Sequence, residues 1–145
     1  MKSKKYKIGY TSGVYDLFHI GHLNILKNAK EYCEKLIVAV STDEVVLKNK
    51  NKKPIICYKD RAEIVKAIKY VDLVVPQERY DIDGKIMAVK ELGVDVMFVG
   101  SDWKNTEKWN SLEKQLNEIG CDVIYLPHTD GISTSIIVET LSHKK

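Results

Sequence analysis

The stretch Thr11–Asn24, which reads TSGVYDLFHIGHLN, gathers the residues of this chain that are best suited to chemistry. It lies between an apolar segment ending in Ile8-Gly9-Tyr10 and a segment with apolar residues at helical spacing. His19 and His22 are three residues apart, so they project from one side of the first turn of the expected helix. The free backbone N–H groups at a helix start favour an anion. The pattern therefore predicts a binding site for a polyanion.

Two other interpretations of these histidines remain open in the sequence. A single histidine beside apolar residues is more often a packed or capping residue than a ligand. His19 and His22 could also share a zinc ion, but no cysteine or third histidine lies at ligand spacing. The full string, a small-residue turn followed by Asp16 and then His-x-Gly-His, favours the anion site over both.

The string GVYDLFHIGH resembles the signature of the cytidylyltransferases, the group of the nucleotidyltransferase superfamily that includes the glycerol-3-phosphate, choline-phosphate and ethanolamine-phosphate enzymes. HIGH also occurs in class I aminoacyl-tRNA synthetases, so alone it indicates only the superfamily. The resemblance runs nearly from end to end and is closest to the glycerol-3-phosphate enzymes. It implies that His19 and His22 are catalytic donors to the phosphates, and that further residues of this motif bind the nucleotide: Ser12, Gly13, Val14, Tyr15, Asp16 and Gly21.

A second motif, HTDGISTS, begins at His128 and resembles the RTEGISTS motif of the cytidylyltransferases. Gly131 permits a tight turn, and the three hydroxyl residues after Ile132 offer an anion further donors at a helix start. Alone, Ser-Thr-Ser before an apolar run is simply a good N-cap. Paired with the first motif, it predicts a second anion grip, with Ser133 and Thr134 catalytic and these residues binding nucleotide: His128, Thr129, Gly131, Ile132 and Ser135.

This second motif departs from the family pattern at its head. The family's arginine is His128 here, and its glutamate is Asp130. A forked donor that is always charged has become one that is only partly charged at neutral pH. The substitution predicts weaker nucleotide binding or a changed pH dependence.

The composition indicates an ordinary globular protein. The 145 residues, 44% hydrophobic and 30% charged, predict one domain over 1–145, which is too short for a synthetase with its tRNA-binding parts. The net charge of +3 suits phosphorylated substrates and is low for a nucleic-acid partner. No apolar run approaches a membrane span and no signal-type segment follows MKSKKYK, so we expect a cytoplasmic protein without a membrane partner. A homodimer is expected only from the resemblance.

Strand and helix patterns alternate along the chain, which predicts a Rossmann-like α/β fold: a five-stranded parallel sheet with helices on both faces. The expected strands are residues 6–11, 36–40, 71–75, 94–99 and 122–126; the expected helices are 22–32, 60–69, 86–92, 107–119 and 133–141. Asp60 is the expected N-cap of the second of these helices, and Pro76 is expected to stop the third strand. Ligands of such sheets bind beyond the carboxyl ends of the strands, where all the candidate residues fall.

The remaining candidates follow other strands. Lys50 and Lys52, in the polar loop 48–53, are expected to close over the phosphates unless the loop is only a solvated linker. Lys50 and Lys85 are candidates for the acceptor. Arg61 is a candidate phosphate contact or the partner of Asp60 or Glu63 in a salt bridge. Asp102 and Trp103, the family's DW pair, are assigned to the nucleotide, and Asp16 and Asp102 either bind Mg²⁺ or are turn residues.

The resemblance implies that a small phosphate monoester attacks the α-phosphorus of CTP and expels pyrophosphate. Glycerol 3-phosphate is the first choice of acceptor, and CDP-glycerol would then supply teichoic acid or capsule synthesis. Such chemistry needs positioning and positive charge rather than a protein nucleophile. The alternatives are an adenylyltransferase of the same superfamily, which ISTSIIV disfavours because it lacks the arginine of the ISSTxxR pattern, a nucleotide-binding module without activity, and a small RNA-binding module.

Overall fold

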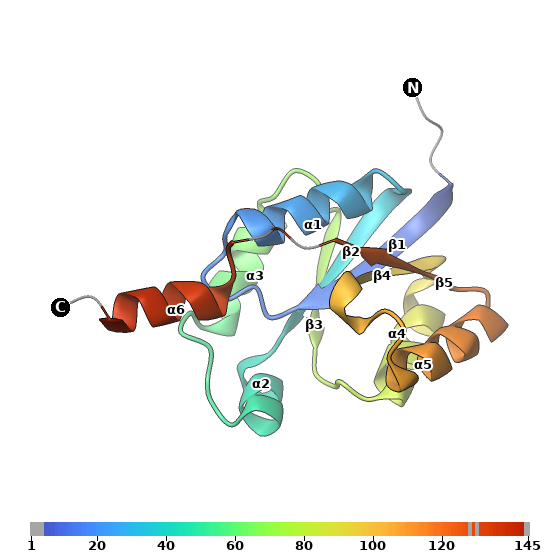
Figure 1. Ribbon diagram of the computed structural model, residues 1–145. Coiled ribbons are helices and arrows are strands. Elements are labelled where there is room, and N and C mark those ends of the chain that lie inside the picture. Colours follow the sequence, from blue (N-terminus) through green and yellow to red (C-terminus); the bar gives the residue numbers. More distant parts are fainter. Residues whose placement is uncertain (1–4, 128, 130, 144–145) are drawn as a thin grey trace.

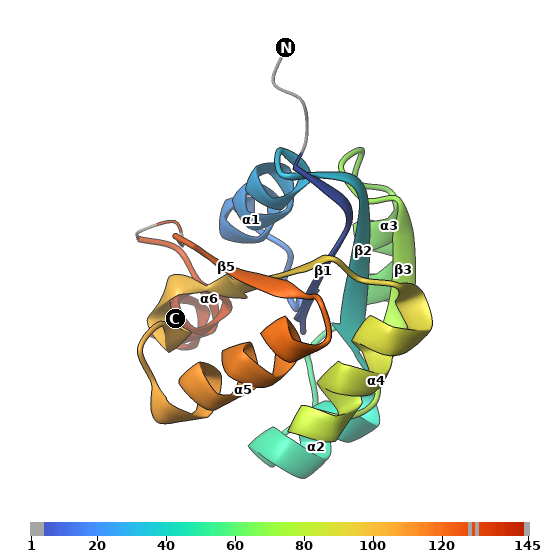
Figure 2. The same ribbon diagram turned by 90° about the vertical axis from the view of Figure 1, so that its right-hand side faces the viewer.

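The computed structural model describes residues 5–127, 129 and 131–143, and it shows a five-stranded parallel sheet with the order β3-β2-β1-β4-β5 (Figures 1 and 2). The strands are β1 (Tyr6–Gly13), β2 (Cys33–Ser41), β3 (Leu73–Gln77), β4 (Val96–Gly100) and β5 (Asp122–Leu126). The helices are α1 (Ile20–Lys30), α2 (Asp43–Lys50), α3 (Tyr58–Lys66), α4 (Ile82–Leu92), α5 (Glu107–Glu118) and α6 (Thr134–His143), with a short 3₁₀ turn, η1 (Ser101–Trp103). The predicted fold class is confirmed.

Two apolar layers enclose the sheet. On one face Leu26 and Ala29 of α1 and Val65 of α3 pack against the sheet, and all three are fully buried. On the other face α4 contributes Val89, while α5 contributes residues that include Leu112. Strand β2 contributes to both layers, and this explains why its sequence is an uninterrupted apolar run.

The strand order reverses beside β1. The chain runs outward from β1 through β2 to β3, and then returns to place β4 on the other side of β1. The turns that follow β1 and β4 therefore begin next to each other at the carboxyl edge of the sheet, which is where ligands bind in open α/β sheets.

Several element boundaries differ from the prediction. Helix α3 begins after Cys57, so Asp60 lies in its first turn and is not the N-cap. Strand β3 continues through Pro76 to Gln77; because β3 is an edge strand, the proline's missing N–H interrupts no ladder to a further strand. Helix α2 extends to Lys50, so only the end of the expected loop 48–53 is a loop.

The sequence contains the reason for the longer α2. Thr42 caps the N-terminus by accepting the Val45 N–H, and two acidic residues occupy the first turn. Lys48 and Lys50 lie in the last turn, where cations are favoured, and Asn51 ends the helix with a left-handed φ of 56°. The lysine run thus stabilises a helix terminus as well as supplying charge. In the described part of the chain no helix has the length and hydropathy of a membrane span.

Candidate active site

The turn between β1 and α1 is tightly constrained. Tyr15 and Leu17 both have positive φ, 57° and 51°, a conformation that non-glycine residues rarely adopt. The Tyr15 ring is buried and lies against Gly13, where an added Cβ would be 3.0 Å from a ring carbon. Burial raises the pKa of the Tyr15 phenol. The turn is thus held by the packing of Tyr15, which compensates for backbone strain of the kind found at functional sites.

His19 and His22 form a reciprocal cap at the start of α1. Nδ1 of His19 accepts the Gly21 N–H at 3.0 Å, and Nδ1 of His22 accepts the His19 N–H at 3.2 Å. The two rings are stacked with their centroids 3.8 Å apart. An Nδ1 atom that accepts cannot carry the proton, so each neutral ring carries it on Nε2. The capping interpretation is therefore correct, and it leaves each Nε2–H group as the donor for a ligand.

The electrostatics of the pair favour neutral rings. The His22 pKa is lowered to about 4, first by burial and then by the neighbouring His19, while Asp16 acts in the opposite direction. Burial also lowers the pKa of His19. At neutral pH these imidazoles therefore act as directed hydrogen-bond donors and not as cations. Net positive charge for a polyanion must come from elsewhere in the site.

The two sequence motifs lie against each other. Thr134 at the start of α6 donates its hydroxyl to the Asp16 carbonyl at 2.7 Å. Asn24 in α1 donates its side-chain N–H to the Thr129 hydroxyl at 2.8 Å. An added Cβ on Gly21 would lie 3.6 Å from Cγ2 of Ile132, which shows how closely the second segment passes the first. The structure thus brings together the turn between β1 and α1, here called the HIGH turn, and the segment 131–135, here called the GISTS turn.

At the beginning of α6, hydroxyl groups serve the backbone. Ser133 caps the helix by accepting the Ile136 N–H at 3.1 Å, while the Thr134 hydroxyl is already donated to Asp16. The backbone N–H groups of the first turn, which an α-helix leaves without intrahelical partners, include those of Thr134 and Ser135. They are better donors for a phosphate than the Thr134 side chain. Gly131 has a φ of 80°, as the tight-turn prediction required, and His128 and Asp130 lie outside the described residues.

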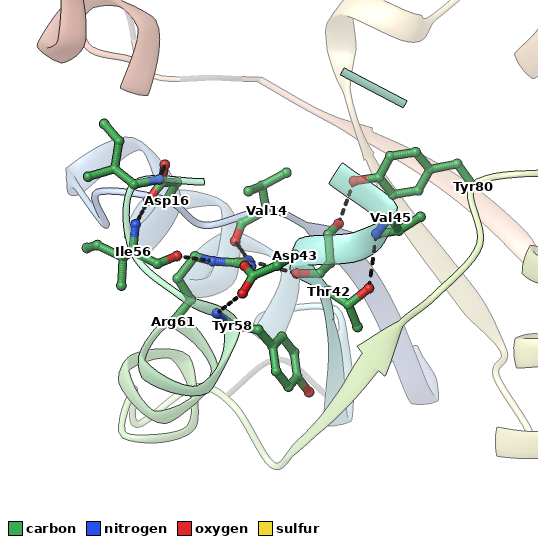
Figure 3. Close-up of polar contacts among 11 residues, drawn as sticks. Val14, Asp16, Thr42, Asp43, Val45, Ile56, Tyr58, Arg61 and Tyr80 are labelled. Carbon is green, nitrogen blue, oxygen red and sulfur yellow. Dashed lines mark hydrogen bonds and ion pairs between the residues drawn. The ribbon is translucent and has the colours of Figure 1, made fainter. Parts of the chain in front are cut away.

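Arg61 is placed differently from the prediction. Its side chain has no exposed surface, and its guanidinium donates to three carbonyl oxygens and one carboxylate (Figure 3). The carbonyls belong to Val14, Ser41 and Ile56, at 2.7, 2.8 and 2.7 Å, and the carboxylate is that of Asp43 at 2.7 Å. Arg61 thus neither reaches a phosphate nor pairs with Asp60 or Glu63; it joins the ends of β1 and β2 to the segment before α3.

The pKa of Asp43 shows the effect of this ion pair, in which the arginine is buried and the carboxylate is partly exposed. Burial alone would raise the pKa of its carboxyl, but hydrogen bonds from Arg61 and from the Tyr58 N–H outweigh that effect and lower the pKa. Asp43 is therefore a carboxylate at neutral pH, and the buried guanidinium has a charged partner.

Asp16 has a structural role in this geometry. Its two carboxylate oxygens accept the N–H groups of Ile55 and Ile56 at 2.7 and 2.9 Å, which ties the chain after the lysine-rich segment to the HIGH turn (Figure 3). Each oxygen accepts one backbone N–H group and keeps a second lone pair, so the turn role of Asp16 is observed and its magnesium role stays a prediction. Asp102 lies in the exposed turn η1 after β4 and stays a candidate, and no cluster of three metal-ligating side chains occurs among the described residues.

The other candidates vary in position. Ser12 lies near the end of β1, half-buried. Lys50 ends α2 and Lys52 lies in the following loop, and both are exposed. Trp103 in η1 is half exposed, whereas Trp109 is buried in the core. Lys50 and Lys52 have no fixed partner among the described residues, so their exposed side chains can reach an anionic ligand.

Lys85 in α4 is a buried cation. It donates to the Tyr80 carbonyl at 2.7 Å, and its ammonium lies 5.8 Å from the centre of the Trp109 ring. Burial, followed by the nearby charge of Lys108, lowers its pKa to about 8, against a smaller opposite effect of Asp81. A buried ammonium with one carbonyl partner is suited to an anionic ligand.

Sequence reasoning missed several residues of this site. Asn24 ends the stretch Thr11–Asn24 but is not among the candidate site residues, although it links α1 to Thr129. Ser41, Asp43 and Tyr80 form contacts at the carboxyl edge that join segments distant in sequence. Of these, only Asp43 carried a local signal, because acidic residues are favoured in the first turn of a helix.

The arrangement offers neutral N–H donors, helix N-termini and lysines at the carboxyl edge of the sheet, which suits transfer between phosphate groups. A family model described as "Cytidylyltransferase-like" matches residues 10–140. The chain belongs to this cytidylyltransferase-like family. The sequence prediction of a nucleotidyltransferase fold and enzyme class is confirmed.

Individual relatives of this family fall into two named activities. The chain is 39% identical to glycerol-3-phosphate cytidylyltransferase of Bacillus subtilis over 91% of this chain and 95% of that protein. It is also 39% identical to FAD synthase of Pyrococcus abyssi, over 90% and 88%. A solved structure, the lipopolysaccharide core biosynthesis protein of Thermoplasma volcanium, superposes with a TM-score of 0.68 at 27% identity, covering 85% and 96%.

Replacing Arg61 by methionine should destabilise the protein by about 3–5 kcal/mol, because it leaves the Asp43 charge without its partner and removes the donor from three carbonyl oxygens. Lys59→Met on the exposed side of α3 is the matched control and should change the unfolding free energy by less than about 0.5 kcal/mol. Urea denaturation measures both. Equal effects for the two variants would contradict the assigned role of Arg61.

The free energy of unfolding should fall as the pH is lowered from about 6.5 to about 4. In that window the unfolded chain protonates His22 while the folded chain does not, so acid favours the unfolded state. His22→Asn keeps an acceptor near the Nδ1 position and removes the titration, so its stability should depend less on pH across this window. Denaturant titrations at pH 4.5, 5.5 and 6.5 make the comparison. Identical slopes for the wild type and His22→Asn would refute it.

Proposed function

We propose that this protein is a cytidylyltransferase that joins CTP and a small phosphorylated alcohol, with glycerol 3-phosphate as the first candidate, to give a CDP-alcohol and pyrophosphate. The observation that carries the proposal is the contact between the two motifs, made by the Thr134 hydroxyl and the Asp16 carbonyl. The contact ties the N-terminus of α6 to the turn that precedes α1, which supports a ligand held by donors from both segments. A triphosphate is a ligand of the charge and length that such a pair accepts.

The reaction we propose is direct. A phosphate oxygen of the acceptor attacks the α-phosphorus of CTP, a new P–O bond forms, and the bond to the β-phosphate oxygen breaks to release pyrophosphate. Negative charge grows on the α-phosphate and on the leaving group, so the protein's task is to position both substrates and supply donors. The Nε2–H groups of His19 and His22 and the N–H groups at the start of α6 fill that role.

The lysines supply the net charge that the neutral imidazoles do not. Lys50 and Lys52 follow β2 on an exposed segment, next to the Ile55 and Ile56 backbone that Asp16 holds. We assign both to the phosphates. Mg²⁺ that enters with the nucleotide would add charge neutralisation, with Asp102 as a candidate carboxylate. Lys85 is assigned to the acceptor phosphate because its buried ammonium has hydrogen-bonding capacity beyond the Tyr80 carbonyl.

A second candidate is an adenylyltransferase, and one observation favours it: an FAD synthase matches this chain at the same 39% identity as a glycerol-3-phosphate cytidylyltransferase. A matrix of CTP, ATP, UTP and GTP against glycerol 3-phosphate, other phosphate monoesters and FMN, with pyrophosphate release and product mass as readouts, separates the two. We expect product with CTP and a small phosphate monoester. FAD from ATP and FMN would replace the first proposal with the second, and no turnover with any pair would refute both.

A pair of variants at His19 tests the donor assignment. The amide side chain of His19→Asn keeps an oxygen near the Nδ1 position to cap Gly21 but has no donor at the ε position, so kcat with CTP should fall by roughly 10²–10³. His19→Gln keeps an ε N–H and loses the cap, so it should retain more activity than His19→Asn while losing more stability. Steady-state kinetics and thermal unfolding give the two readouts. Near wild-type turnover of His19→Asn would show that Nε2 is not a donor to the transition state.

A further inference from the structure

Buried polar side chains gather at one edge of this molecule. The described residues include six that are polar or charged and buried: Thr11, Asp16, Ser41, Arg61, Gln77 and Lys85. All but Thr11, which donates to the Phe98 carbonyl within the sheet, lie in the segments that follow or end at the carboxyl ends of the strands. Burying such groups costs free energy unless they are hydrogen-bonded. Their concentration at this edge points to a shared task.

Tyr80 connects Lys85 to the end of β2 through two separate hydrogen bonds, one at its carbonyl and one at its hydroxyl. The Lys85 ammonium donates to the Tyr80 carbonyl at 2.7 Å, and the Tyr80 hydroxyl donates to Ser41 Oγ at 2.8 Å. Ser41 Oγ in turn donates to Gln77 Oε1 at 3.0 Å, at the end of β3. Figure 3 shows Tyr80 pointing toward the group of contacts around Arg61. The segment 78–81 is thereby fixed to two strand ends.

The end of β2 is also connected to the turn after β1, which carries the first motif. The Ser41 carbonyl accepts from Arg61, which donates to the Val14 carbonyl just before the HIGH turn. Through its side chain and its carbonyl, Ser41 thus connects the segment before α4 with the turn after β1. Lys85 has the Tyr80 carbonyl as its one hydrogen-bond acceptor within residues 5–127, 129 and 131–143.

We propose that Tyr80 is a positioning residue for the acceptor: its hydroxyl, anchored on Ser41, holds the segment whose carbonyl keeps the Lys85 ammonium at the carboxyl edge of the sheet, facing a phosphate monoester. The assignment of Lys85 to the acceptor rests on the proposed function, whereas the hold of Tyr80 on Lys85 does not. Without the Tyr80 hydroxyl, the segment 78–81 loses its side-chain link to β2. The Lys85 ammonium then becomes more mobile and more hydrated. Recognition of the acceptor should then weaken while nucleotide recognition is unchanged.

The test uses three variants of the whole chain. Tyr80→Phe removes one oxygen and leaves the ring, and Ser41→Ala removes the other partner of the same bond. Tyr6→Phe is the matched control, because it removes a tyrosine hydroxyl bonded to Asp122 at the opposite edge of the sheet. If Tyr80 and Ser41 act through one bond, the double variant should show no more effect on Lys85 than the stronger single variant.

The first readout needs no substrate. The ¹³Cε signal of Lys85, assigned by its loss in Lys85→Arg, gives the pKa of the ammonium in ligand-free protein. We expect about 8 in the wild type and in Tyr6→Phe, and a rise toward the ordinary 10.5 in Tyr80→Phe and Ser41→Ala. An unchanged pKa of Lys85 in a folded Tyr80→Phe protein overturns the proposal, whatever the enzyme's substrate is.

The second readout is kinetic. With CTP and glycerol 3-phosphate, Tyr80→Phe should raise KM for glycerol 3-phosphate by roughly tenfold and change KM for CTP less than twofold, as a lost charge-assisted contact of about 1.4 kcal/mol would do. Equal changes in both KM values would indicate a merely structural role and overturn the proposal. If no acceptor reacts with CTP, the proposed function fails, and the titration of Lys85 still decides whether Tyr80 positions it.

Discussion

The burial of one guanidinium organises the carboxyl edge of this sheet. Arg61 takes its charge fully out of water, and the structure offsets that cost with three carbonyl oxygens and the Asp43 carboxylate. These acceptors come from the end of β1, the end of β2, the start of α2 and the segment before α3. Because the fork of an arginine has fixed geometry, the four backbone segments must keep their relative positions. A site for two anionic substrates needs such a frame, since like-charged ligands repel.

At this edge the imidazoles are neutral hydrogen-bond donors, and the lysines carry the positive charge. The caps at the start of α1 fix the proton of each ring on Nε2, and burial keeps His22 neutral. A neutral donor at a fixed angle can follow the charge that develops in a transition state without a large change in its own hydration. Exposed lysines on the segment after β2 carry positive charge, which acts on an anion at longer range. Directed hydrogen bonds and positive charge are therefore supplied by different residues.

Local signals explain which parts of the structure could be predicted from the sequence. The alternation of apolar runs and helical patterns was enough for the fold class, and the turn residues placed both motifs at one edge. The role of Arg61 could not be predicted, because its partners are 5 to 47 residues away and no periodicity records them. Local sequence alone predicts that Pro76 ends its strand. The strand continues because β3 lies at the edge of the sheet, and that position depends on the tertiary structure. The lysine run likewise predicts a loop, whereas its cations stabilise the end of α2.

Overall sequence similarity does not identify the acceptor substrate. Relatives with the same 39% identity are named as a glycerol-3-phosphate cytidylyltransferase and as an FAD synthase, so percentage identity alone does not distinguish the two acceptors. In this structure the two motifs and the Arg61 contacts hold backbone positions and N–H donors. The segment between β3 and α4 lies outside both motifs, yet its Tyr80 is fastened to the same strand end as Arg61. Under the proposed function, a change in that segment would alter recognition of the acceptor while the segments held by Arg61 keep their geometry.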